Sequence, residues 1–247
     1  MKIAAIKTHK IRAGEEDLFS ILDKYLKKVP EGSVLAVTSK IISLCEGGVV
    51  KIGAVDKDEL IKSEADFFLP RSASKYDVML AIKDGLIVPS SGIDESNADG
   101  YYVLWPKNPQ ESANKILKYL KKRFHLKKAG VIITDSKTTP LRWGTSGVAI
   151  AHSGFSALND YIGRPDIFRR KLKMTKANIM DALAATAVLV MGEGREQTPI
   201  AIIENLPFVR FQNRVPSRAE LKELRITIED DLYSPLLKAV KWRKGKK

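Results

Sequence analysis

The sequence predicts an α+β fold with mixed, partly antiparallel sheets and flanking helices. The chain has 247 residues, and 44% of them are hydrophobic, which is enough to bury a sizeable core. Apolar runs typical of buried strands and stretches with helical spacing follow one another without the regular strand–helix–strand rhythm of a doubly wound fold. No internal repeat or linker divides the chain. We therefore expect one unit over residues 1–240, of one or two lobes, and a basic tail at 241–247.

The first expected elements are a helix and a strand. Apolar side chains recur three and four residues apart from Leu18 to Val29, which predicts an amphipathic helix that ends before the turn at 30–32. The apolar segment 33–38 directly after this turn predicts a strand.

The second half of the chain predicts two helices and three strands. The helix at 108–124 begins with an N-cap, a proline at the first helical position and a capping box, formed by Asn108, Pro109 and Glu111. Wholly apolar runs predict buried strands at 130–135, 148–151 and 200–203. Apolar residues fill most of the segment 177–191, so we expect this helix to be nearly enclosed.

The composition excludes several classes of protein. Cys45 is the single cysteine, so no internal disulfide forms, and with three histidines available no Cys/His zinc cluster can be assembled. No stretch approaches the about 18 apolar residues that a membrane helix needs. We expect a cytoplasmic protein without a membrane partner.

The charge favours an anionic partner. There are 42 Lys and Arg against 29 Asp and Glu, which gives a net charge of +13. Basic runs within 121–128, 169–173 and 241–247 hold much of the excess. No nucleic-acid-binding motif accompanies these runs, so solvated helix ends and a loose tail are favoured over a nucleic-acid surface.

Three polar clusters interrupt otherwise apolar sequence, at 89–100, 134–136 and 191–196. Each offers a carboxylate on a turn at the end of an apolar element. Mg²⁺ and Mn²⁺ bind one or two carboxylates together with a hydroxyl, waters and substrate phosphates. Any one cluster alone is more typical of an Asx-turn or a helix cap. Walker A, dinucleotide-binding and nucleophile-elbow motifs are absent.

Several other residues are expected to be structural. Glycines at 47–48 and 192–194 would let backbone N–H groups approach a phosphate, although plain turns are commoner. We expect Cys45 to be a small buried residue, and we assign no catalytic role to His9 or His152.

Taken together, the polar clusters resemble a known family. The segments that carry the resemblance, in chain order, are Ala36–Ser43 followed by Glu46–Gly47, Gly92–Asn97, Val131–Ser136, Gly147–Ile150, Asp160–Arg164 and Met191–Gly194. They resemble the coenzyme F420-0:L-glutamate ligases over nearly the whole chain up to about Glu204. The segments 92–97 and 134–136 carry most of the specificity.

The resemblance implies a ligase that depends on a nucleotide, GTP or ATP, and on Mg²⁺ or Mn²⁺, two ions per site. It would join L-glutamate to an acceptor carboxylate through an acyl phosphate. Carried over by position, Asp94 and Asp135 would hold one metal, and Ser136 and Glu193 a second. The other residues that the resemblance assigns are Arg142 in catalysis and Thr38, Ser39, Lys40, Asn97, Gly192, Gly194 and Arg195 in nucleotide or substrate binding. Loops at 7–12, 38–40 and 192–199 would line the nucleotide site.

The resemblance also implies an intertwined homodimer. Aromatic and apolar residues of one expected strand need cover, and either a partner or the subunit itself would provide it. These residues are Tyr101, Tyr102, Leu104 and Trp105.

The sequence departs from the family at positions that affect the acceptor. Leu44 stands where many members carry lysine, and Thr139 and Trp143 stand where arginines occur. Arginine has a planar fork suited to phosphate and carboxylate, so these exchanges alter recognition of an anionic acceptor. The acceptor is either coenzyme F420-0 or a reduced folate. We favour the folate, because Trp143 offers a flat face to its ring unless it packs in the core.

A second hypothesis comes from a different class of protein. The chain would then be a non-catalytic nucleotide- or nucleic-acid-binding protein that retains the ligase fold and uses its basic surface. The intact acids Asp94, Asp135 and Glu193 argue against it, since nothing structural requires all three.

Overall fold

The computed structural model describes all residues, 1–247, and its centre is a five-stranded sheet in the order β1-β12-β2-β8-β9. β2 and β8 run parallel, whereas the other neighbours are antiparallel. The predicted α+β class with mixed sheets is confirmed. The strands of this sheet are β1 (Lys2–Ile6), β2 (Ser33–Thr38), β8 (Ala129–Thr139), β9 (Arg142–Ser153) and β12 (Ile200–Glu204).

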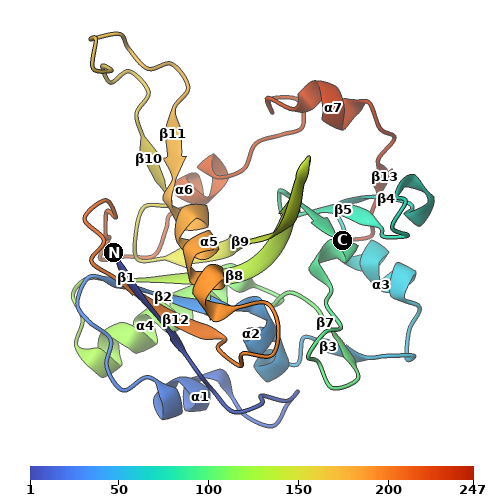
Figure 1. Ribbon diagram of the computed structural model, residues 1–247, viewed down its shortest axis with the longest axis horizontal. Coiled ribbons are helices and arrows are strands. Elements are labelled where there is room, and N and C mark those ends of the chain that lie inside the picture. The colour runs from blue at the N-terminus through green and yellow to red at the C-terminus, as the bar shows by residue number, and fades with distance from the viewer.

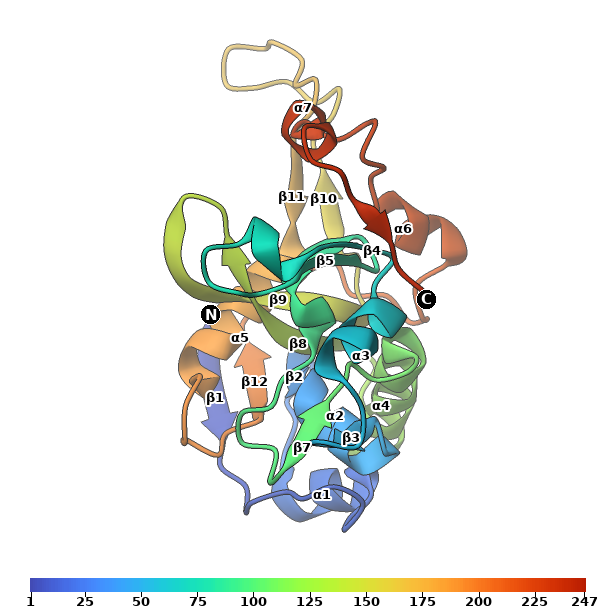
Figure 2. The ribbon, with the colours of Figure 1, turned by 90° about the vertical axis from the view of Figure 1, so that its right-hand side faces the viewer.

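Helices cover both faces of the central sheet (Figures 1 and 2). Alternate residues of a strand point to opposite faces. Leu35 and Val131 therefore pack with α1, α2 and α4, while Val34 and Ile132 pack with α5. These helices are α1 (Leu18–Tyr25), α2 (Ser39–Glu46), α4 (Pro109–Phe124) and α5 (Ile179–Met191).

Residues 49–103, between α2 and α4, form most of a smaller lobe. It has its own core, which includes Ile61, Phe68, Met79 and Tyr102. A four-stranded sheet in the order β13-β4-β5-β6 and a pair β3-β7 form it together with α3. Its elements are β3 (Val49–Lys51), α3 (Lys57–Glu64), β4 (Phe67–Leu69), η1 (Arg71–Ala73), β5 (Leu80–Lys83), β6 (Leu86–Pro89), η2 (Ser90–Gly92) and β7 (Tyr101–Val103).

An arm projects from the body of the molecule (Figures 1 and 2). It is an antiparallel pair, β10 (Leu158–Asp160) and β11 (Lys176–Asn178), joined by a long loop. Large apolar side chains in that loop are exposed, among them Ile167, Phe168 and Met174. The arm thus carries apolar surface that the rest of the subunit does not cover.

Two predicted helices differ in extent or in burial. α1 ends at Tyr25, since Leu26 has an extended backbone, although Leu26 and Val29 are still buried. α5 is not nearly enclosed, so that prediction is wrong. Leu189 is 80% exposed and Val190 also reaches the surface, because only one side of the helix packs on the sheet.

Residues 39–46 form a helix, α2, which the sequence did not predict; a loop was expected at 38–40. Thr38 is the extended N-cap residue of α2, and Ser39 and Lys40 lie in its first turn. Gly47 ends the helix with a φ of 75°, and its N–H donates to the carbonyl of Ser43. Gly47 therefore acts as a helix terminator, because glycine adopts this left-handed conformation without strain.

The C-terminal segment crosses the molecule and ends on the smaller lobe (Figure 1). It contains α6 (Arg218–Glu223), α7 (Ser234–Lys238) and β13 (Arg243–Lys244), and β13 pairs with β4. The basic tail is therefore not loose, contrary to expectation. No helix of the structure combines the length and the apolarity needed to cross a membrane.

The aromatic residues expected to need cover receive it within the subunit. Tyr102 belongs to the core of the smaller lobe, and Trp105 is 4% exposed. These two side chains therefore need no partner, and they give no support to a dimer.

Candidate functional site

The central sheet carries two of the candidate residues past the end of a neighbouring strand. Thr38 of β2 is opposite Thr134, and β8 continues beyond this pair to Thr139. Asp135 and Ser136 therefore lie within a strand, not on a turn as the sequence suggested. Because side chains alternate along the strand, Asp135 faces the side of α2 and α4, and Ser136 faces the side of α5.

Asp94 follows η2 in the smaller lobe and is held by a lysine of α2. Lys40 Nζ lies 2.6 Å from Oδ2 of Asp94 and also donates to the carbonyl of Ser96. The backbone N–H of Ser96 donates to Oδ1 at 2.7 Å. Burial works against the charge of Asp94, but the hydrogen bonds from Lys40 and Ser96 outweigh it and lower the pKa of this carboxyl.

Asp135 lies in a different environment from Asp94. Its carboxylate accepts a hydrogen bond from the indole N–H of Trp105. Burial raises the pKa of Asp135 to about 6, and the charge of Asp94 adds to this, whereas Ser136, Trp105 and Lys40 act in the opposite direction. The two carboxylates are thus close enough to repel each other.

Ser136 and Glu193 form a second pair, on the other side of β8. Ser136 Oγ donates to both carboxylate oxygens of Glu193, at 2.7 and 2.9 Å, and Thr145 Oγ1 lies 3.4 Å from the same carboxylate. Glu193 directly follows Gly192, which ends α5. Asn97 connects the loop after η2 to the loop after α5, since its Nδ2 donates to the carbonyl of Gly194 at 3.0 Å.

The remaining candidate residues lie at the start of α2, on the β8–β9 hairpin and in the loop after α5. Thr38, Ser39 and Lys40 lie at the start of α2. Arg142 begins β9 at the exposed tip of the β8–β9 hairpin, and Arg195 is exposed in the loop after α5. Neither arginine forms an ion pair within the subunit, so both guanidinium groups are available to a ligand.

The oxygen donors fit a hard divalent cation. Three or more His, Cys, Asp or Glu side chains do not gather at any one point. Mg²⁺ does not require such a cluster, because it usually binds one or two carboxylates and completes its shell with waters and phosphates. The pairs Asp94–Asp135 and Ser136–Glu193 offer such sets, and Lys40 places a positive charge beside Asp94.

Comparisons with known proteins agree with this arrangement. The family model described as F420-0:Gamma-glutamyl ligase matches residues 5–205. The chain belongs to this family. The coenzyme F420:L-glutamate ligase of Methanocaldococcus jannaschii is 34% identical over 82% of this chain and 88% of its own length. The ligases of the same name from Methanopyrus kandleri and Archaeoglobus fulgidus are 32% and 30% identical, over 86% and 90% of this chain and 90% and 92% of their own lengths.

Family membership sets the class of chemistry. The chain is an amide-bond-forming ligase, as the resemblance implied. The hypothesis of a non-catalytic binding protein is therefore not carried further.

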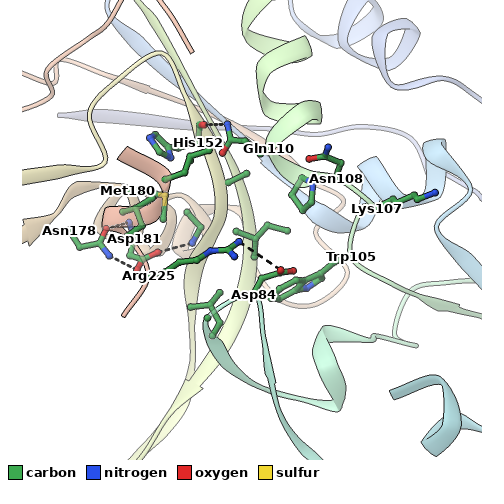
Figure 3. Close-up of a pocket in the computed structure, with 18 of the residues that line it drawn as sticks. Asp84, Trp105, Lys107, Asn108, Gln110, His152, Asn178, Met180, Asp181 and Arg225 are labelled. Carbon is green, nitrogen blue, oxygen red and sulfur yellow. Dashed lines mark hydrogen bonds and ion pairs between the residues drawn. The ribbon is translucent and has the colours of Figure 1, made fainter. Parts of the chain in front are cut away.

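A cavity of about 360 Å³ adjoins the candidate site of the ligase (Figure 3). Trp105 is shared between the two, since its ring lines the cavity while its N–H reaches Asp135. The N-cap residues of α4 and α5, Asn108 and Asn178, border the cavity. Arg225 and Lys247 of the C-terminal segment also line it, each paired with Asp84.

Two contacts near the candidate residues were not predicted from the sequence. Trp105 was expected only to need cover, because nothing in the sequence brings it to Asp135. His9 has contacts with two groups, Glu16 at 2.6 Å from Nε2 and the Tyr25 hydroxyl at 2.6 Å from Nδ1, so it fixes the segment 7–12 against α1. The spacing of His9 and Tyr25 carries no local signal, since the pair forms only through the tertiary fold.

Proposed function

We propose that this ligase joins L-glutamate to the terminal carboxylate of coenzyme F420-0, with GTP or ATP and with Mg²⁺ or Mn²⁺. The observation that carries the proposal is the match, over most of the chain, to ligases named for coenzyme F420 and L-glutamate. The four oxygen-bearing residues of the two pairs, all intact and held in place, support the metal dependence.

The reaction needs two transfers. In the first, a carboxylate oxygen of the acceptor attacks the γ-phosphorus of the nucleotide, an acyl phosphate forms, and the nucleoside diphosphate leaves. In the second, the amine of glutamate attacks the acyl carbon, phosphate leaves with its bonding electrons, and the amine loses a proton. Divalent cations neutralise the phosphate charge that both transfers redistribute.

The residues of the site divide between metal and nucleotide in this proposal. Asp94 and Asp135 would hold one ion, and Ser136 and Glu193 the second. Lys40 now neutralises Asp94, and a divalent cation at this carboxylate would release its ammonium group for the nucleotide phosphates or a substrate carboxylate.

The loops after η2 and α5 supply the other contacts of the proposed nucleotide site. Asn97 ties these two loops together through the carbonyl of Gly194. Gly192, Gly194 and Arg195 would line the nucleotide there, beside Thr38 and Ser39 at the start of α2. The first residues of a helix present free N–H groups, which favour phosphate.

A reduced folate is the second candidate acceptor, and the exposure of Trp143 is compatible with it. Trp143 is 90% exposed at the tip of the β8–β9 hairpin, so it is not packed in the core and its face is open to a ring. Arg142, beside it, is also exposed and would meet a carboxylate of the acceptor. The same two residues are available to the deazaflavin ring and the phosphodiester of coenzyme F420-0.

The acceptor is tested by direct glutamylation. The protein is incubated with L-glutamate, each nucleotide, each metal, and either coenzyme F420-0 or tetrahydrofolate, and products are analysed by mass spectrometry. We expect the deazaflavin acceptor to gain one glutamyl unit, with the larger kcat/KM. A clear preference for tetrahydrofolate would transfer the proposal to the folate, and no gain with either acceptor would contradict it.

The acyl phosphate intermediate is tested by isotope labelling. With ¹⁸O in the acceptor carboxylate, an acyl phosphate passes one labelled oxygen to inorganic phosphate. Unlabelled phosphate would exclude this intermediate. Asp135→Asn should abolish both product and label transfer, whereas Asp77→Asn, an exposed aspartate of the smaller lobe, is the control and should retain both.

A further inference from the structure

Trp105 links two parts of the molecule that the proposed mechanism treats separately. Its ring lines the cavity of Figure 3, and its indole N–H donates to Oδ2 of Asp135. The side chain is buried, so water does not compete for this donor. A hydrogen bond to an ionised acceptor in such surroundings is stronger than one between neutral groups.

A buried cation lies over the indole of Trp105. Nζ of Lys83 is 5.0 Å from the ring centroid, and the residue is 3% exposed. Glu64 compensates the charge at 2.6 Å, which allows the ammonium group to remain buried. A cation above the ring face attracts its π electrons and so makes the N–H a better donor.

The glycine of the segment 92–97 provides the space that the indole occupies. Gly92 has a φ of +71°, and a Cβ at this position would lie within 3.0 Å of the Trp105 atoms Nε1, Cε2 and Cζ2. Both the backbone conformation and the neighbouring ring therefore require glycine here. Gly92 and Asp94 belong to the same short segment. This segment therefore provides the carboxylate of Asp94 and also the space for the indole of Trp105, which donates to Asp135.

We propose that Trp105 is a positioning residue that fixes the carboxylate of Asp135 for metal binding, with Gly92 providing the space and Lys83 strengthening the donor. The inference rests on the proposed role of Asp135 as a metal ligand. Hydrogen-bond donors behind a metal ligand typically alter metal affinity by about 10- to 100-fold.

The contact itself is tested in the metal-free protein. The indole N–H resonance of Trp105 is assigned by its absence from the NMR spectrum of Trp105→Phe. We expect this resonance downfield of that of the exposed Trp143, and we expect it to move upfield in Asp135→Asn. A resonance that does not respond to Asp135→Asn would overturn the inference.

The effect on metal is tested by Mn²⁺ binding, followed by electron paramagnetic resonance without substrates. Trp105→Phe should weaken binding by about 10- to 100-fold. Trp242→Phe is the matched control, because it also loses an indole hydrogen bond, to the Leu237 carbonyl at 2.8 Å, and should bind as the wild type does. Asp135→Asn provides the reference for a lost ligand.

The outcomes separate this inference from the proposed function. Weak binding in Asp135→Asn with wild-type binding in Trp105→Phe would overturn the positioning role and leave the metal role of Asp135 in place. Wild-type binding in both variants would remove Asp135 as a ligand and the inference with it.

Gly92→Ala reaches the same hydrogen bond from the other side and guards against a Trp105→Phe variant that packs poorly. We expect Gly92→Ala to weaken Mn²⁺ binding to a similar extent, and the double variant to bind no more weakly than either single variant. Fully additive losses in folded proteins, checked by urea unfolding, would show that glycine and indole act independently and would contradict the proposal.

Discussion

Asp94 and Glu95 are adjacent in the sequence but face different partners. Lys40 lies beside Asp94, whereas Lys57 lies 3.1 Å from Glu95. Asp94 therefore lies in the candidate site, whereas the neighbouring carboxylate of Glu95 pairs with a lysine of α3. Their comparison isolates the charge that the proposed metal site needs.

We expect Asp94→Asn to lower kcat by at least about 100-fold at saturating metal, since the variant removes a proposed anionic ligand while it keeps the size of the side chain. Stability should change by less than about 1 kcal/mol, because the pair with Lys40 is partly exposed and screened. Steady-state kinetics and urea unfolding measure the two effects. Glu95→Gln should retain near wild-type kcat, and a similar loss in both variants would contradict the assignment.

We expect the stability of the protein to depend on pH through His152, which has no role in the proposed reaction. It is 1% exposed, its Nδ1 has no partner, and burial lowers its pKa to about 4. Glu220 is the neighbouring charge that acts in the opposite direction. The unfolded chain takes up the proton near the ordinary pKa of 6.5, so the native state loses stability as the pH falls from about 6.5 to about 4.

We expect this loss to reach about 2–3 kcal/mol. Urea unfolding at a series of pH values measures it. His152→Leu should remove that part of the slope, and His125→Asn, which replaces the left-handed residue after α4, should keep it. Equal slopes in the wild type and in His152→Leu would show that other groups cause the loss.

Candidate residues could be named from the sequence, but their contacts could not. Asp94, Asp135, Ser136 and Glu193 were assigned through the family resemblance. In the structure Ser136 contacts Glu193 directly, whereas Asp94 is held by Lys40 and Asp135 by Trp105. The partner of each depends on elements far apart in the chain, such as α2 for Asp94. Local patterns contain no information on such contacts, so Trp105 could not be connected with Asp135 beforehand.

At the scale of elements, predictions succeeded where the hydrophobic period was clear. The strand 33–38 was found from its apolar run. The helix 108–124 was found because its apolar period and its capping residues agree, and Asn108 does cap α4 by accepting from the N–H of Glu111. α2 was missed because its β-branched Ile41 and Ile42 favour a strand locally. Packing of both side chains into the core overrides this preference.

The C-terminal strand is an element whose role can be measured. β13 pairs with β4, Gly245 N–H donates to the carbonyl of Asp66, and Lys246 Nζ lies 2.6 Å from Glu59. The ion pair is exposed and contributes little, so most of the stabilisation comes from the covered edge of β4. Deletion of residues 243–247 should lower the free energy of unfolding by about 1–2 kcal/mol.

Urea unfolding of the truncated chain measures this loss. Gly245→Ala is a sharper variant, because a Cβ at this position would collide with the backbone of Ala65, and it should cost nearly as much as the deletion. Lys246→Gln removes only the exposed charge and serves as the control. If the deletion had no effect, β13 would not contribute to the fold.

Several large apolar side chains are exposed on α5, on the β8–β9 hairpin and on the arm. Leu189 on α5, Trp143 on the β8–β9 hairpin, and Ile167 and Phe168 on the arm are all largely exposed. Monomeric proteins seldom expose large contiguous apolar patches. These residues replace Tyr102 and Trp105 as the reason to expect a homodimer, since the latter two are buried within the subunit.

We expect a dimer at micromolar concentration, in which the arm and the outer side of α5 meet the partner. A stable dimer buries about 1,600 Å² or more, so a charge placed within that surface has no water to solvate it. Phe168→Glu and Leu189→Lys should therefore shift the mass measured by light scattering toward the monomer. Ile226→Glu, on the exposed C-terminal segment, is the control and should remain a dimer. If the wild-type protein has the mass of a monomer at micromolar concentration, the dimer is excluded, because these apolar surfaces then do not associate.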